Sequence, residues 1–153
     1  MQTQLNSQAP KPLVWSIAGS DCMAGAGIQA DVKAIHGLDG LANTVITAVT
    51  AQNHTGVIDI NAVTIDVLTS QIEALIQADI EHSVEQFYLP NVIKVGLLAN
   101  AEQVEFVADF IAKCKNHLKT AAPIVVYDPV LSASNGGQLT EDNLVEIIKI
   151  KLL

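Results

Sequence analysis

The sequence has few cysteines, few basic residues and no long apolar run, and each shortage excludes a class of protein. Its two cysteines, Cys22 and Cys114, form no Cys-x-x-Cys pair, so we expect free thiols in a reducing compartment, the cytoplasm. Eight Lys and Arg against 16 Asp and Glu give a net charge of -8, which argues against a nucleic-acid partner. No apolar run approaches the roughly 20 residues that cross a bilayer, so no membrane partner is expected either.

The chain is long enough for one domain with a real core. Half of its 153 residues are apolar and 16% are charged, a composition typical of a buried sheet. Residues 1–13 are rich in Gln, Asn, Ser and Pro and have no apolar core, so we expect a disordered or frayed tail there, neither a signal peptide nor a membrane anchor. Residues 14–153 show no internal boundary and are expected to form part of a single domain.

Strand-like and helix-like segments alternate along this domain. Core strands are predicted over residues 14–18, 44–50, 92–97 and 123–127, with a short edge strand over 57–60. Helices are predicted over residues 27–38, after a cap at Thr64 or Asp66, around 104–118, and over 141–153 behind a cap at Thr140. Repeated strand and helix units of this kind predict an α/β fold of three layers, a mostly parallel sheet with helices on both faces.

Polar or small residues follow each predicted core strand, where a parallel sheet binds its ligands. These segments are Gly19-Ser20-Asp21, Gln52-Asn53, Gly96-Leu97 and Asp128-Pro129-Val130. Because the carboxyl ends of parallel strands meet at one edge, we expect them to share one pocket. Four histidines, His36, His54, His82 and His117, show no metal-ligand spacing with Cys or acidic residues, so no metal site is assigned from the sequence.

Four residues near these strand ends have both a binding and a structural interpretation. Gly25 and Gly27 allow a close approach of backbone to a ligand, or make a tight turn that binds nothing. Asp31 is either a ligand-binding carboxylate or a surface charge that offsets the helix dipole. Gln52 ends an otherwise apolar strand and needs a hydrogen-bond partner, which a heteroaromatic ring with an exocyclic amine would provide.

The order of these segments resembles one enzyme family. Ile17-Ala18-Gly19-Ser20-Asp21 and the loop over 24–31, Ala-Gly-Ala-Gly-Ile-Gln-Ala-Asp, are followed by matching segments at 45–48, 51–53, 94–98 and 125–130. Together they are similar to the hydroxymethylpyrimidine and phosphomethylpyrimidine kinases of thiamine biosynthesis, in the ribokinase-like superfamily. The resemblance runs from about residue 14 to residue 153 and implies the N-terminal, substrate-side part of such a kinase, with the ribokinase-like fold incomplete at its C-terminus.

The resemblance implies ATP-dependent phosphorylation of 4-amino-5-hydroxymethyl-2-methylpyrimidine and of its monophosphate, with Mg²⁺ as a cofactor. Asp31 and Gln52 would hold the aminopyrimidine and its hydroxymethyl group, and Thr50 and Leu97 would pack near the ring. Gly19 and Gly25 would complete the substrate side, and Asp128 would lie toward the nucleotide phosphates and Mg²⁺. A small pyrimidine is the implied partner, and a homodimer is compatible with the family.

The sequence also departs from the family. Cys22-Met23-Ala24 replaces a segment that has one more glycine, Leu97 stands where Met is frequent, and Ser134-Asn135-Gly136 stands where Lys-Ser-Gly or Thr-Ser-Gly is usual. The family's Gly-Thr-Gly segment, which would supply the anion hole and base, does not occur in these 153 residues. We therefore expect no catalytic residue within this chain and no activity from the chain alone.

Two other functions are compatible with parts of the sequence. A catalytically inactive pyrimidine-binding or scaffold fragment of the same family would not need the anion hole. A dinucleotide-binding oxidoreductase could use Gly25-x-Gly27-x-x-Ala30, but no acidic residue lies near position 45 to hold a ribose.

Overall fold

A five-stranded sheet forms the middle of the molecule in the computed structural model, which describes residues 11–80, 89–118, 122–130 and 144–153. The strands are β1 (Leu13–Asp21), β2 (Leu41–Asn53), β3 (Gly56–Ala62), β4 (Val92–Val95) and β5 (Ile124–Tyr127). They lie in the order β3-β2-β1-β4-β5, so β1 is central. β1 pairs in parallel with β2 and β4, β4 pairs in parallel with β5, and β3 is antiparallel to β2. The predicted mostly parallel sheet is confirmed.

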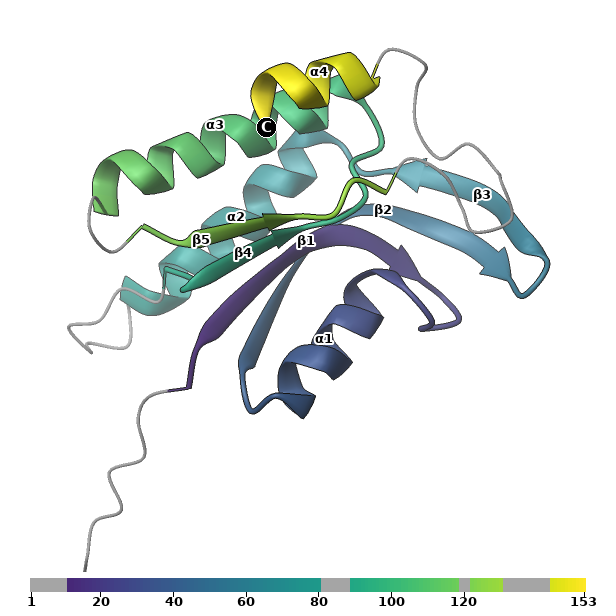
Figure 1. The fold of residues 1–153 in the computed structure, drawn as a ribbon, viewed down its shortest axis with the longest axis horizontal. Coiled ribbons are helices and arrows are strands. Elements are labelled where there is room, and N and C mark those ends of the chain that lie inside the picture. Colours follow the sequence, from purple (N-terminus) through teal and green to yellow (C-terminus); the bar gives the residue numbers. More distant parts are fainter. Residues whose placement is uncertain (1–10, 81–88, 119–121, 131–143) are drawn as a thin grey trace, which may run out of the picture.

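Helices cover both faces of this sheet (Figure 1). α1 (Gly27–Gly37) lies on one face against β1 and β2, and α2 (Ile65–Ile80), α3 (Ala101–Leu118) and α4 (Leu144–Lys151) lie on the other. The predicted α/β architecture of three layers is therefore correct. Within the described ranges, no helix is both long enough and apolar enough to span a membrane.

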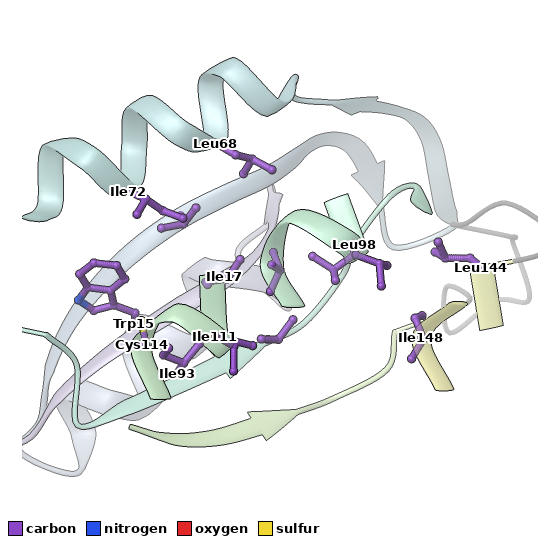
Figure 2. Close-up of a cluster of buried hydrophobic side chains, with 14 of the residues drawn as sticks. Trp15, Ile17, Leu68, Ile72, Ile93, Leu98, Ile111, Cys114, Leu144 and Ile148 are labelled. Carbon is purple, nitrogen blue, oxygen red and sulfur yellow. The ribbon is translucent and has the colours of Figure 1, made fainter. Parts of the chain in front are cut away.

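The main core lies between the sheet and the three helices on its second face (Figure 2). Trp15 and Ile17 of β1 point into this core, whereas Ser16 between them points toward α1, as the two-residue period of a strand requires. The Trp15 ring stacks on Phe110 of α3 with centroids 5.9 Å apart. Each of these helices contributes apolar residues that are all buried: Leu68, Ile72, Val104, Val107, Ile111, Cys114, Leu144 and Ile148.

Several boundaries differ from the sequence predictions. β1 extends to Asp21 because it pairs with β2 beyond the bulge near Gly19, and β2 extends to Asn53 because its last residues pair with β3. β4 ends at Val95, two residues early, where the chain turns at Gly96. Cys22 and Cys114 are both free, as predicted. The predicted cap Thr140 and residues 1–10 of the predicted tail lie outside the described part of the chain.

The carboxylate of Asp21 holds the connection between β1 and α1. Its Oδ1 accepts a hydrogen bond from the backbone N–H of Met23 (2.8 Å), and its Oδ2 accepts from those of Gly25 (3.0 Å) and Ala26 (2.9 Å). Burial raises the pKa of Asp21, but the Gln52 side-chain amide and these three N–H groups lower it by more, so the pKa lies below its usual 3.8. The turn is therefore organised around an ionised carboxylate.

Two residues of this turn have a left-handed backbone. Gly27 has a φ of +59°, and a Cβ there would lie 2.3 Å from the carbonyl oxygen of Gly19, so only glycine fits. Ala24 has a φ of 55°, which a residue with a Cβ rarely adopts. The turn therefore contains local strain at Ala24, in the segment where the chain has one glycine fewer than the family pattern.

The last described strand has an exposed apolar face. Val125 and Tyr127 of β5 pack against the main core, whereas Ile124 and Val126 point to the opposite face and are 67% and 49% exposed. β5 is also an edge strand of the described sheet, and α1 packs against β1 and β2. An apolar edge strand of this kind favours association with other chains.

Replacing Ala24 by glycine is expected to stabilise the chain by roughly 0.5–1 kcal/mol, because relief of about 1–2 kcal/mol of left-handed strain is partly offset by the entropy of glycine in the unfolded state. Denaturant unfolding measures this free energy. The matched control is Ala26→Gly, at an extended residue of the same turn, which should not stabilise. An Ala24→Gly variant less stable than the parent chain would contradict the argument.

Acid should weaken the Asp21 turn. Because the pKa of Asp21 is lowered by folding, its contribution is present at pH values above 3.8 and is lost as the pH falls through the folded-state pKa. Asp21→Asn is expected to lower the free energy of unfolding at pH 7 by about 1–3 kcal/mol, since the amide group loses acceptor capacity for buried N–H groups. It should also flatten the acid dependence. Equal acid sensitivity of the two proteins in denaturant unfolding at pH 7 and below pH 4 would refute the assignment.

Self-association of the chain is expected to pass through β5. Ile124→Lys or Val126→Lys should lower the apparent mass seen in sedimentation velocity at high protein concentration, because a lysine ammonium resists burial at an edge strand. Ile150→Lys serves as the control, since Ile150 is 76% exposed on α4, which lies on the face of the sheet opposite to α1. A parent chain that stays monomeric at all concentrations would show the expectation to be wrong.

Candidate functional site

A cavity of about 340 Å³ opens at the carboxyl ends of the parallel strands. Its wall brings together six residues predicted from the sequence to form the site, Gly19, Asp31, Thr50, Gln52, Leu97 and Asp128. They come from β1, α1, β2 and the segments after β4 and β5, so residues more than 100 positions apart in the chain share one wall. The convergence expected from the strand ends is present, and the cavity has a size suited to a small ligand.

Gly25 is the predicted site residue that the cavity wall does not include. Its N–H donates to Asp21 Oδ2, and a Cβ at this position would make only an ordinary 3.6 Å contact with the same oxygen. Gly25 thus belongs to the Asp21 turn behind the cavity. Gly27, by contrast, lines the cavity at the start of α1.

Asp31 occupies the floor of the cavity and is not a surface charge. Its Oδ2 accepts hydrogen bonds from Ser16 Oγ at 2.6 Å and from Lys94 Nζ at 2.9 Å. The side chains of Lys94 and Asp31 are 22% and 19% exposed, so the ion pair is largely removed from water. No described residue donates a hydrogen bond to Oδ1.

Gln52 and Thr50 lie on the cavity side of β2. The Thr50 hydroxyl donates to the carbonyl oxygen of Ser20 at 3.0 Å, which ties the end of β2 to the end of β1. The Gln52 side chain lies near the Asp21 carboxylate and is one of the causes that lower the pKa of Asp21. The Gln52 side-chain amide offers both a donor and an acceptor to a ligand in the cavity.

An apolar wall faces these polar groups. Leu97 is buried beside Gly19, where a Cβ would lie 3.0 Å from Leu97 Cδ2, so the absence of a side chain at Gly19 lets the two segments approach. The backbone oxygen of Leu97 accepts a 2.6 Å hydrogen bond from the buried Thr47 hydroxyl, which fixes the turn after β4. Val57 of β3 also lines the cavity. A flat ring can therefore contact apolar atoms while its polar edge meets Asp31 and Gln52.

Asp128 lies at the rim of the cavity directly after β5. Its N–H donates to the carbonyl oxygen of Val95 at 2.9 Å, which places the start of this segment beside the turn after β4. Burial raises the pKa of the neighbouring Tyr127, and the charge of Asp128 raises it further. The described residues contain no group of three or more His, Cys, Asp or Glu side chains that could hold a metal ion.

A smaller, separate cavity of about 300 Å³ lies at the beginning of α2 and α3. Thr64 and Asn100 stand just before these helices, and Asp66 and Glu102 lie in their first turns. Its buried amide, Gln103, already donates to the carbonyl oxygens of Thr47 and Val63 and accepts from the N–H of Ala99. This cavity therefore contains no buried polar side chain that lacks a partner.

Sequence reasoning missed two residues that shape the main cavity. Lys94 was not predicted as a site residue, although a lysine inside the apolar strand Val92–Val95 is itself a signal, because a buried ammonium needs a partner. Gln29 was also missed. Its Oε1 accepts from the N–H of Asp21 (2.9 Å) and its Nε2 donates to Ser20 Oγ (2.7 Å), which joins α1 to the end of β1.

Known proteins match the sequence of this chain over most of its length. Residues 21–153 match the family model described as phosphomethylpyrimidine kinase. The hydroxymethylpyrimidine/phosphomethylpyrimidine kinase of Haemophilus influenzae is 39% identical over 140 residues, which cover 92% of this chain and 46% of that protein. The protein of the same name from Bacillus subtilis is 38% identical over 138 residues, covering 90% and 45%. The chain thus spans about half the length of the curated relatives it matches.

Solved structures agree with this relationship. A phosphomethylpyrimidine kinase from Clostridium difficile superposes with a TM-score of 0.69 at 30% identity, covering 90% of this chain and 53% of that one. The pyridoxal kinase of Staphylococcus aureus, in complex with pyridoxal, gives 0.70 at 25% identity, covering 94% and 47%. The fold is that of the ribokinase-like vitamin kinases. By its sequence match and its strand order, the chain belongs to the phosphomethylpyrimidine kinase family.

Proposed function

We propose that this chain forms the pyrimidine-binding part of a cytoplasmic, ATP-dependent kinase that phosphorylates 4-amino-5-hydroxymethyl-2-methylpyrimidine and its monophosphate. The observation that supports the proposal most strongly is the convergence of the Asp31 carboxylate and the Gln52 side-chain amide, from separate elements, on one cavity beside an apolar wall. An aminopyrimidine offers the complementary surface, a flat ring with an exocyclic amine that donates hydrogen bonds.

In this proposal the residues of the chain bind and orient the alcohol. Gln52 and Asp31 accept hydrogen bonds from the amine or hydroxyl groups of the ligand, and Leu97, with Thr50 beside it, packs near the ring. The absence of a side chain at Gly19 keeps Leu97 close to β1. Holding the hydroxyl group in one orientation lowers the entropic part of the barrier to phosphoryl transfer.

We infer ATP as the phosphoryl donor, and Mg²⁺ as its cofactor, from the family relationship. A structure of the Staphylococcus aureus pyridoxal kinase contains the ATP analogue AMP-PCP. In this chain Asp128 is the acidic residue that we place toward the phosphates. A Mg²⁺ ion at such a site is usually held by one or two carboxylates together with the phosphates of the bound nucleotide. We therefore assign the described cavity to the acceptor alcohol and derive no transfer step from it.

Pyridoxal is the alternative acceptor that a structural relative suggests, because the Staphylococcus aureus enzyme has been solved with it. Its pyridine ring has a hydroxymethyl group but no exocyclic amine. If Gln52 and Asp31 recognise the amine, the aminopyrimidine should bind more tightly than pyridoxal.

Calorimetric titration of the chain with 4-amino-5-hydroxymethyl-2-methylpyrimidine tests the proposal. Gln52→Ala and Asp31→Ala are each expected to raise the Kd roughly five- to twelvefold, because each removes a hydrogen bond worth roughly 1–1.5 kcal/mol. Circular dichroism should show that both variants remain folded. The parent chain should bind pyridoxal more weakly.

Matched controls are available for both variants. Asn53→Ala removes the neighbouring amide, which is exposed and accepts from Thr55 outside the cavity. Asp109→Asn removes a carboxylate exposed on α3, on the other side of the sheet. Both controls should bind like the parent. Unchanged affinity in the Gln52 and Asp31 variants, or no binding by the folded parent chain, would overturn the site assignment.

A further inference from the structure

We infer that Lys94 determines which charge of ligand the cavity accepts: by pairing with Asp31, it makes the site specific for an uncharged ring. This inference rests on the proposed function, since it concerns how the same cavity recognises its pyrimidine. Lys94 would act through Asp31 as a positioning and specificity residue, without itself taking part in the reaction.

Strand register brings the three groups of this network together. Lys94 of β4 pairs directly with Ser16 of β1, and both side chains point to the face covered by α1, where Asp31 lies. Ser16 and Lys94 both donate to the same oxygen, Asp31 Oδ2. Two donors on one oxygen hold in place the Asp31 carboxylate, which lines the cavity.

Space for the Lys94 ammonium exists because residue 96 is glycine. A Cβ at Gly96 would lie 3.0 Å from Lys94 Nζ and 2.9 Å from the Cβ of Ala18. Both distances are too short for a side chain to be added without displacing a neighbour. The Gly96 backbone therefore leaves the ammonium room beneath the cavity, in contact with Asp31.

Lys94 also supplies the positive charge of the cavity. Among the described residues that line it, Asp21, Asp31 and Asp128 are acidic and Lys94 alone is basic. The Asp21 carboxylate already accepts three hydrogen bonds from N–H groups of the turn, and Asp128 lies at the rim of the cavity. The charge next to a bound ring is therefore set by the Asp31–Lys94 pair, whose two charges offset each other.

An ion pair whose two charges offset each other favours a neutral ligand over a cation. With Lys94 present, the Asp31 carboxylate accepts a hydrogen bond from the ligand while the ammonium repels a positively charged ring. Without Lys94, an unpaired and largely buried carboxylate would attract a cation and gain from neutralisation. Selection of this kind works by excluding the wrong ligand as much as by binding the right one.

The test compares two ligands in the full 153-residue chain by calorimetric titration at a pH well above the pKa of the ring. One ligand is neutral 4-amino-5-hydroxymethyl-2-methylpyrimidine, and the other is its N-methylated, permanently cationic pyrimidinium salt. The readout is the ratio of their affinities. The added methyl group has the same steric cost in the parent chain and in every variant. A difference in this ratio between two proteins therefore reports a change in charge preference.

Lys94→Met and Lys94→Gln are each expected to shift the ratio at least about tenfold toward the cation. A neighbouring opposite charge shifts an ionisation equilibrium by about tenfold or more, and the cationic ring responds to the same charge. Lys94→Arg keeps the charge and should retain the parent ratio within about threefold. Two neutral variants of different shape keep the test valid if one of them fails to fold.

The outcomes separate this inference from the proposed function. A parent chain that prefers the neutral ring, with both neutral variants shifted toward the cation, supports the inference. A parent chain that binds the neutral ring, with equal losses for both ligands in the variants, gives Lys94 a purely structural role and overturns the inference while the proposed function stands. A folded parent chain that binds neither ligand overturns both.

Discussion

The carboxylate of Asp21 is the interaction on which the site depends. It ends the central strand and binds three backbone N–H groups of the following turn, so the direction in which α1 leaves the sheet is fixed at this residue. Gln29 reinforces the same junction from the first turn of α1. Because Asp31 follows two residues later, its carboxylate is placed over β1 and β4, where Ser16 and Lys94 meet it. A local turn thereby positions a group that binds across the sheet.

The sheet contributes the other half of the site through its strand order. β1 is central and parallel to both neighbours, so the ends of β1, β2 and β4 and the segment after β5 reach the same edge. β2 extends past the helical layers with β3 as its antiparallel partner and carries Gln52 and Thr50 to the cavity (Figure 1). Acceptors from α1 and β2 thus face the apolar wall at Leu97. The arrangement needs no basic patch, which agrees with the strongly negative charge of the chain.

The sequence was sufficient to predict the layers, the parallel sheet and most of the cavity wall, because apolar periodicity and the position of polar residues after strands reflect the backbone directly. The sequence did not show that Gly25 lies outside the cavity wall. The pattern of glycines does not reveal which N–H groups face a ligand and which donate to Asp21. It also missed the partner of Asp31. The pairing with Lys94 depends on the register of β1 against β4, and 63 residues separate the two side chains in the chain. A charged residue in a buried strand was the available signal.

The central claim is that the cavity at the strand ends binds an aminopyrimidine. Its most direct test is a two-dimensional amide NMR titration of the isotope-labelled chain with 4-amino-5-hydroxymethyl-2-methylpyrimidine. The account predicts that the largest shifts fall on the amides around Gly19, Ala30, Asp31, Gln52 and Leu97, which line the cavity. Shifts concentrated at Thr64, Asn100 and Gln103 around the second cavity, or no shifts at saturating ligand, would contradict it.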